Sequence, residues 1–146
     1  TRYQDRPEAI YVDAIGIGAG LADRLQELDL PAVGISVSES PSLKDKFMRL
    51  RDELYWNCRS FFEGRDVQIP NDDVLISELT NIRYKYLSTG KLKIEGKDEL
   101  KRRGSRSPDV ADAFVLTFAA DGAIAGGQST RWSSKGSLQQ DLSWVV

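Results

Sequence analysis

The sequence predicts a domain of the α/β class, and three features support this. Residues 9–37 have the pattern of a strand, a helix and a second strand. Two stretches with helical periodicity come next, at residues 43–63 and 71–82, and a hairpin is expected between residues 83 and 95. A last helix is expected from Pro108 onward. Strands that alternate with helices at this spacing are typical of α/β domains.

The first stretch has the pattern of a βαβ unit. Residues 9–12 are apolar and favour a strand, which ends at Asp13 before a glycine-rich turn at residues 16–20. A helix is then expected from Leu21 to Leu28, because its leucines repeat at helical spacing. Residues 32–37 predict the second strand. Two strands joined by one short helix predict a parallel pair.

The middle of the chain predicts two helices. Ser42 is a residue type that caps helices, and apolar residues recur at intervals of three and four over residues 43–63. Gly64 is expected to end this helix. Asn71 or Asp72 is expected to cap the next one.

The last third of the chain predicts a hairpin and two more helices. Residues 83–88 and 91–95 flank Thr89-Gly90, a pair that favours a tight turn between strands. Residues 97–103 predict a short basic helix. The final helix is expected over residues 108–119, with a proline at its first position.

Length and composition fit one globular domain. Of the 146 residues, 40% are hydrophobic and 29% are charged, which is typical of a folded chain. We assign residues 1–121 to this domain and the Gly- and Ser-rich residues 122–146 to a C-terminal tail. The single cysteine, Cys58, excludes an internal disulfide and favours a reducing environment. No apolar run approaches the roughly 20 residues that cross a bilayer, so no association with a membrane is expected.

Charge is distributed unevenly along the chain. The formal net charge of −2 is unlike that of most nucleic-acid-binding domains. Residues 85–106, however, hold eight basic and three acidic residues, a net charge of +5 that leaves −7 for the rest of the chain. This segment either faces water or binds a polyanion, and charge alone leaves both interpretations open.

The absence of histidine excludes several kinds of active site. Without histidine, Ser-His-Asp and Cys-His catalysis and histidine-ligated zinc are impossible. Carboxylates remain, and they favour hard ions such as Mg²⁺ or Mn²⁺. The glycines at positions 16, 18 and 20 lack the spacing of a dinucleotide-binding loop, and no Walker lysine follows them. A tight turn is therefore expected there instead of a phosphate site.

Three aspartates are the candidates for chemistry. Asp13 follows a predicted parallel strand, at the sheet edge where α/β proteins bind ligands, although an aspartate there can also cap the turn. Asp109 and Asp112 share one face of the last helix, in its first turn, where the helix dipole favours acids in any case. Apolar residues surround Asp112, so its carboxylate is expected to be partly buried and to need a partner, such as a metal.

Two parts of the chain resemble a known family. Residues 10–25 resemble the second acidic strand and its helix in the nuclease domain of large terminase subunits of tailed bacteriophages. Residues 97–101 and 107–114 resemble the closing motif of that domain, and the second of them contains the string Ser-Pro-Asp-Val-Ala-Asp-Ala. The resemblance extends over roughly residues 8–120, and the closing string is its more specific part.

This resemblance implies an RNase H-like fold, with a mixed sheet flanked by helices. It also implies a DNA endonuclease that cuts concatemeric phage DNA by a two-metal mechanism. In that mechanism Asp13 and Asp112 would be ligands of Mg²⁺ or Mn²⁺, and Asp109 an auxiliary ligand or a group that positions water. The basic segment gains a DNA-binding role, for which the candidates are Lys97, Lys101 and Arg103.

The resemblance also implies a biological context. Double-stranded DNA is the implied substrate, and the terminase small subunit and the portal protein are implied partners of the full-length protein. The implied location is the host cytoplasm, apart from the mature virion. RNase H-like nucleases carry a first acid on an opening strand, and the 12 residues before Asp13 are too few for it. We therefore expect an N-terminally truncated domain, without the packaging ATPase domain, whose own activity the sequence does not decide.

Three other interpretations stay open. A resolvase- or transposase-type RNase H-like nuclease would use the same carboxylates, and a preference for branched DNA would distinguish a resolvase. A non-catalytic RNase H-like module that holds DNA or a packaging partner is favoured by the missing first acid. A Rossmann-type oxidoreductase fits the βαβ start but not the glycine spacing.

Overall fold

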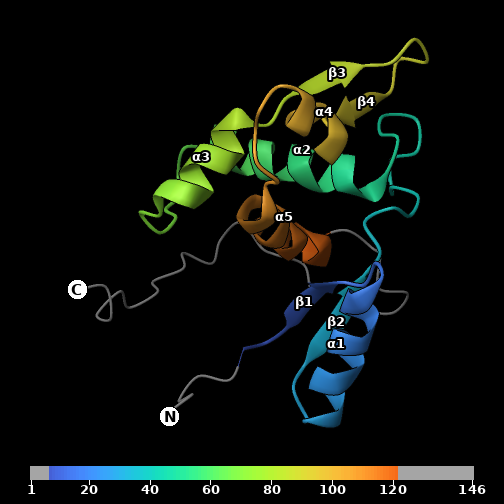
Figure 1. The fold of residues 1–146 in the computed structure, drawn as a ribbon, viewed down its shortest axis with the longest axis vertical. Coiled ribbons are helices and arrows are strands. Elements are labelled where there is room, and N and C mark those ends of the chain that lie inside the picture. Colours follow the sequence, from blue (N-terminus) through green and yellow to red (C-terminus); the bar gives the residue numbers. More distant parts are fainter. Residues whose placement is uncertain (1–6, 122–146) are drawn as a thin grey trace.

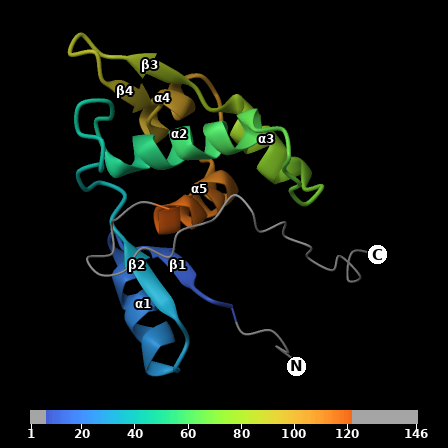
Figure 2. The same ribbon diagram turned by 180° about the vertical axis from the view of Figure 1, so that it is seen from behind.

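The chain folds into two parts that lie one above the other along its longest axis (Figure 1). The computed structural model describes residues 7–121. Two strands and one helix form the lower part, and a hairpin with three helices forms the upper part. α5 (Asp109–Leu116) lies between these two parts in both ribbon views (Figures 1 and 2).

The lower part is the predicted βαβ unit. β1 (Ile10–Asp13) and β2 (Ala32–Ile35) pair in parallel, in a register that places Asp13 opposite Ile35. α1 (Ile17–Glu27) joins the strands and packs against both. The predicted parallel pair is therefore confirmed.

α1 begins earlier than the sequence analysis predicted. The helix was expected from Leu21, whereas it starts at Ile17 and contains the glycines at positions 18 and 20. Gly16 precedes the helix with a φ of 66°, a conformation that favours glycine. An ideal Cβ on Gly18 would lie 1.7 Å from the Asp13 carbonyl oxygen. The glycine-rich segment therefore provides the tight turn and also a close approach between α1 and the end of β1.

α2 (Leu50–Glu63) is shorter than the predicted helix, which was expected to start at residue 43. The segment before it pairs with the hairpin instead of continuing the helix. The Leu92 amide donates to the Lys46 carbonyl at 2.7 Å, and the Met48 amide donates to the Leu92 carbonyl at 3.3 Å. These bonds satisfy backbone groups that a longer helix would otherwise have paired.

The rest of the upper part agrees with the predicted elements. α3 (Asp73–Asn81) is capped by Asp72, whose carboxylate accepts the Leu75 amide at 2.9 Å. β3 (Tyr84–Tyr86) and β4 (Leu92–Ile94) form the predicted antiparallel hairpin. Three helical elements follow, namely α4 (Lys97–Arg102), α5 (Asp109–Leu116) and the 3₁₀ helix η1 (Thr117–Asp121).

The hydrophobic core joins α2, β4 and α5. Its members from these three elements are 5% exposed or less, and they include Leu50, Leu54, Leu92, Ile94 and Val115. Burial of such side chains is the main stabilising contribution to a domain of this size. The same packing fixes the first turn of α5, which carries Asp109 and Asp112, beside α2.

The α/β fold class is confirmed, and the strands form two separate pairs. Within residues 7–121 one sheet is the parallel pair β1–β2 and the other is the antiparallel pair β3–β4. α5 packs against both β1 and α2 and lies between the two sheets (Figure 2).

No helix of the described chain is long and apolar enough to span a membrane. The tail predicted for residues 122–146 lies outside the described residues.

Asp52 connects the start of α2 to the hairpin. Its side chain is buried, and its two oxygens accept the backbone amides of Arg49 at 2.9 Å and Ile94 at 2.8 Å. Asp52→Ala leaves both amides without this partner, so we expect the free energy of unfolding to fall by about 2–3 kcal/mol. Urea unfolding measures this change. Asp45→Ala, at an exposed position, is the control, and equal losses for the two variants would contradict the expectation.

Candidate active site

Asp112, in the first turn of α5, is held by two side chains of α2. Its Oδ1 accepts hydrogen bonds from Arg51 Nη2 at 3.0 Å and Nε at 3.3 Å, and from the Tyr55 hydroxyl at 2.7 Å. Arg51 and Tyr55 stand one helical turn apart, so both reach the same carboxylate. The Asp112 side chain is 24% exposed. The carboxylate is therefore partly buried, as its apolar neighbours predicted.

The same two α2 residues tie Asp112 to the rest of the domain. Arg51 Nη1 donates to the Glu95 carbonyl at 3.0 Å, just after β4. Its guanidinium carbon lies 4.7 Å from the centre of the Tyr55 ring. Burial, followed by the Asp112 charge, raises the pKa of Tyr55 above its ordinary value. The hydroxyl therefore stays protonated at neutral pH and donates to Asp112.

Lys97, at the start of α4, lies between the two aspartates of α5. Its Nζ is 3.5 Å from Asp109 Oδ1 and 3.5 Å from Asp112 Oδ2. The Ser107 hydroxyl donates to Asp109 Oδ1 at 2.7 Å. That hydrogen bond, and then the Lys97 charge, hold the pKa of Asp109 below its ordinary value. Asp109 is thus ionised at neutral pH, and two cations, Arg51 and Lys97, face Asp112.

Asp13 ends β1 with an exposed side chain. Its Oδ1 accepts the Ile15 amide at 3.1 Å, which is the turn-capping bond that the sequence allowed. α5 packs against β1, so the strand that ends at Asp13 is a neighbour of the helix that carries Asp109 and Asp112.

The three candidate aspartates are brought together only in part. Asp109 and Asp112 meet at Lys97, but within residues 7–121 no three His, Cys, Asp or Glu side chains lie close enough together to hold a metal ion. The donor chemistry of Asp112 nevertheless suits Mg²⁺ or Mn²⁺, since Oδ1 is fixed and Oδ2 already faces a positive charge. A divalent ion at Oδ2 would take the place of the Lys97 ammonium.

The three basic candidates for DNA binding have different environments. Lys97 faces the aspartates, and Lys101 is exposed on α4. Arg103 donates to the two carboxylate oxygens of the buried Glu95, each at 2.7 Å, and to Asn81 Oδ1 at 2.9 Å. Its hydrogen bond lowers the pKa of Glu95. A DNA phosphate would therefore compete with Glu95 for this guanidinium.

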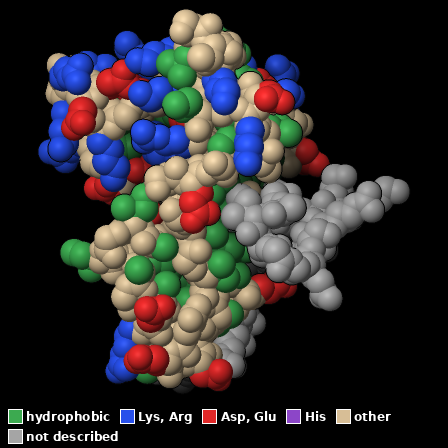
Figure 3. All heavy atoms as spheres, turned by 90° about the vertical axis from the view of Figure 1, so that its right-hand side faces the viewer, with side chains coloured by type: hydrophobic (Ala, Val, Ile, Leu, Met, Phe, Trp, Pro, Cys, Tyr) green, Lys and Arg blue, Asp and Glu red, His purple; other side chains and the backbone are tan. Residues whose placement is uncertain are grey.

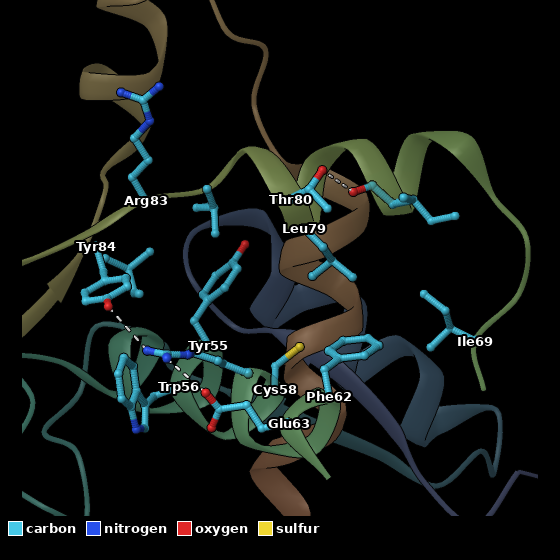
Figure 4. Close-up of a pocket in the computed structure, with 14 residues that line it drawn as sticks. Tyr55, Trp56, Cys58, Phe62, Glu63, Ile69, Leu79, Thr80, Arg83 and Tyr84 are labelled. Carbon is cyan, nitrogen blue, oxygen red and sulfur yellow. Dashed lines mark hydrogen bonds and ion pairs between the residues drawn. The ribbon is translucent and has the colours of Figure 1, made fainter. Parts of the chain in front are cut away.

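A cavity of about 540 Å³ lies between α2, α3 and β3 (Figure 4). Its walls are mostly apolar and include Tyr55, Cys58 and Phe62 from α2 and Leu79 from α3. Tyr55 therefore has two environments, because its ring lines this cavity while its hydroxyl holds Asp112.

Cys58 is expected to resist thiol reagents in the folded protein. Burial raises the pKa of its thiol to about 11, and only the thiolate reacts. A cysteine in the unfolded chain has a pKa of about 8.5. Burial of the neutral thiol therefore contributes fully to the free energy of unfolding below that pH, and the contribution is lost as the pH rises towards 11. At pH 8 an aromatic disulfide reagent should react at least about tenfold more slowly without denaturant than with it. Equal rates would contradict burial of the thiol.

Arg51 and Tyr55 are the site residues that sequence analysis missed. They lie 61 and 57 positions from Asp112 in the sequence, so no local motif contains them. Two signals were available: the expected burial of Asp112, and a cation and a phenol spaced four apart on a helix with an apolar face. Neither signal indicates which helix meets Asp112.

Comparison of the sequence with protein-family models and with curated proteins gives no match. Solved structures are similar to this chain. The nuclease domain of the large terminase subunit gp2 of bacterial virus Sf6 matches with a TM-score of 0.63, at 26% identity, over 77% of this chain. A mutant of that domain with manganese and beta-thujaplicinol gives a TM-score of 0.64 at 25% identity, and a mutant with calcium gives 0.63 at 26%, each over 77% of this chain.

The fold is that of a terminase nuclease domain. The resemblance indicated by residues 10–25 and 107–114 is thereby confirmed, together with the RNase H-like α/β fold class that it implied. The chain spans 65% of the length of these Sf6 domains.

Proposed function

We propose that this chain is the metal-dependent DNA endonuclease domain of a viral DNA-packaging terminase, which cuts concatemeric phage DNA. One observation carries the proposal: the Asp112 carboxylate is fixed by Arg51 and Tyr55 within the fold of a terminase nuclease domain. Structures of the Sf6 domain with manganese and with calcium support the use of a divalent ion.

The proposed ligands of Mg²⁺ or Mn²⁺, in a two-metal site, are Asp13 and Asp112, and Asp109 is an auxiliary ligand or positions water. When bound, the ions would stabilise negative charge on the attacking and leaving oxygens of the phosphodiester. Arg51 and Tyr55 hold Oδ1 of Asp112 in one direction, so that Oδ2 is presented without a change of rotamer. A carboxylate oriented in advance binds its ligand at a smaller entropic cost.

Double-stranded DNA is the proposed substrate. Lys97, Lys101 and Arg103 are proposed to contact its phosphates, with Arg103 dividing its donors between Glu95 and the DNA. In the full-length protein, the terminase small subunit and the portal protein are the proposed partners, and the host cytoplasm is the proposed location.

Nicking of supercoiled plasmid DNA in Mn²⁺, Mg²⁺ or EDTA tests the proposal. We expect nicked DNA with a divalent ion and none with EDTA, and we expect Asp13→Asn and Asp112→Asn to remove the activity. A melting curve adds a second measurement, since an ion that binds the folded chain raises the midpoint. A rise that both variants lose would place both acids at one ion site, whereas a full-length nuclease domain without nicking would refute the proposal.

A non-catalytic DNA-binding module is the second candidate. It is favoured by the positive charges of Arg51 and Lys97, which both pair with the Asp112 carboxylate. DNA affinity that is equal with and without divalent ions, combined with no cleavage, would support this candidate. Faster cleavage of branched than of linear DNA would instead indicate a resolvase-type nuclease.

A further inference from the structure

We propose that an exposed aromatic surface on the hairpin and α2 binds unpaired bases of single-stranded DNA. This aromatic surface consists of Trp56, Arg59, Tyr84 and Tyr86. The inference rests on the proposed function only in taking DNA as the polyanion, and it adds an unpaired strand to the substrate.

Two tyrosines of β3 are the exposed part of the aromatic surface. Tyr84 is 47% exposed and Tyr86 is 64% exposed. Because side chains alternate along a strand, both lie on one side of β3, with ring centres 6.0 Å apart. Lys85 lies on the other side, where it pairs with Glu99 at 2.5 Å. Neighbouring exposed aromatic rings on one face are typical of a binding surface.

α2 extends this surface with a third ring and a fixed cation. The Trp56 and Tyr84 rings meet edge to face, with centres 5.4 Å apart, at the edge of the cavity (Figure 4). The Arg59 guanidinium carbon lies 4.4 Å from the Trp56 ring centre and 5.6 Å from that of Tyr84. Glu63 holds the same guanidinium at 2.9 Å. A positive charge is thus kept beside rings on which a base can stack.

The charge of the hairpin indicates the kind of partner. Residues 83–94 contain no acidic residue and four basic ones, Arg83, Lys85, Lys91 and Lys93. Lys and Arg side chains gather over the upper part of the molecule in the space-filling view (Figure 3). Aromatic rings among basic residues fit single-stranded nucleic acid, since stacking binds any base and the cations bind the backbone. A duplex would use the charge but not the rings, because its bases are stacked internally.

The aromatic surface is connected to the candidate active site. The residue after β4 is Glu95, whose carbonyl accepts Arg51 Nη1 at 3.0 Å. Arg51 also holds Asp112. An unpaired strand on the hairpin would therefore lie on the element that leads to the proposed cleavage centre.

Fluorescence anisotropy with a labelled oligo-dT of about 20 nucleotides, in EDTA to prevent cleavage, tests the inference. Tyr86→Ala should weaken binding at least about fivefold, because one stacked base is lost. Tyr86→Phe keeps the ring, so its affinity should stay within about twofold of the wild type. Ile17→Ala is the control, because it removes exposed apolar surface at a 94% exposed position on α1. Its affinity for oligo-dT should equal that of the wild type.

Several outcomes would overturn the inference. One is equal affinity of Tyr86→Ala and wild type for oligo-dT, which would mean that the charge of the DNA backbone alone accounts for binding. Another is no binding of oligo-dT, which would exclude single-stranded DNA as the partner of this surface. Melting curves of the variants guard against misfolding, and Tyr86 is exposed enough for its loss to be tolerated. Tyr86-dependent binding of oligo-dT, combined with a full-length nuclease domain that does not nick plasmid DNA in Mn²⁺, would support this inference and refute the nuclease. Nicking combined with binding that does not depend on Tyr86 would do the reverse.

Discussion

Asp112→Asn is expected to reduce metal-dependent nicking at least about 100-fold. The substitution keeps the shape of the side chain but removes the negative charge that Arg51, Tyr55 and Lys97 surround. An amide is a much poorer ligand for a hard divalent ion than a carboxylate. The initial rate of plasmid nicking in Mn²⁺ measures the effect.

Two further variants show whether the loss at Asp112 is specific. Tyr55→Phe removes one hydrogen bond to Oδ1 and leaves the carboxylate in place, so we expect a smaller loss of about 10-fold. Asp109→Asn changes a side chain that is 76% exposed, and the nicking rate should fall less than with Asp112→Asn. Nicking by Asp112→Asn at the wild-type rate would remove Asp112 from the proposed site.

Gly18→Ala is expected to lower the free energy of unfolding by about 3 kcal/mol or more. The added Cβ would lie 1.7 Å from the carbonyl oxygen of Asp13, and backbone on both sides has to move to relieve the overlap. Urea unfolding gives the change in free energy. Because the displaced residue is Asp13, the metal-dependent rise in melting midpoint should be lost as well.

Gly20→Ala is the matched control for this variant. Gly20 lies in the same helix, two residues further on, and nothing is within 4 Å of its ideal Cβ. Alanine favours a helix over glycine by up to about 1 kcal/mol, so this variant should be more stable than the wild type. We expect the free energy of unfolding to fall for Gly18→Ala and to rise for Gly20→Ala. A similar fall for both variants would show that the close approach at Asp13 is not the cause of the loss in Gly18→Ala.

The fold was predictable where the signals were local. The apolar run at residues 9–12, the leucines of α1 and the capping residue Asp72 each determine their own element over a few positions. The predicted start of α2 was wrong because a distant interaction competes with the helix. The backbone of Lys46 and Met48 pairs with Leu92, more than 40 residues along the chain. Helical periodicity contains no information about such pairing.

The candidate site was predictable to a smaller extent. Partial burial of Asp112 followed from its apolar neighbours, and the proximity of Asp109 from its spacing on one helix. The donors that surround Asp112 come from α2, and their identity depends on how α2 and α5 pack. The assignment of Arg103 as a DNA ligand stays a proposal, while the structure adds its bonds to Glu95 and Asn81, which the charge pattern could not show.

The separation of 61 positions between Arg51 and Asp112 also has a kinetic meaning. A contact between distant parts of a chain forms only when the loop between them closes, and that closure costs chain entropy. A partly folded form that contains α2 and the hairpin, but has not docked α5, would lack the oriented carboxylate altogether. Metal binding at the proposed site is therefore expected to appear only once α5 has docked against α2.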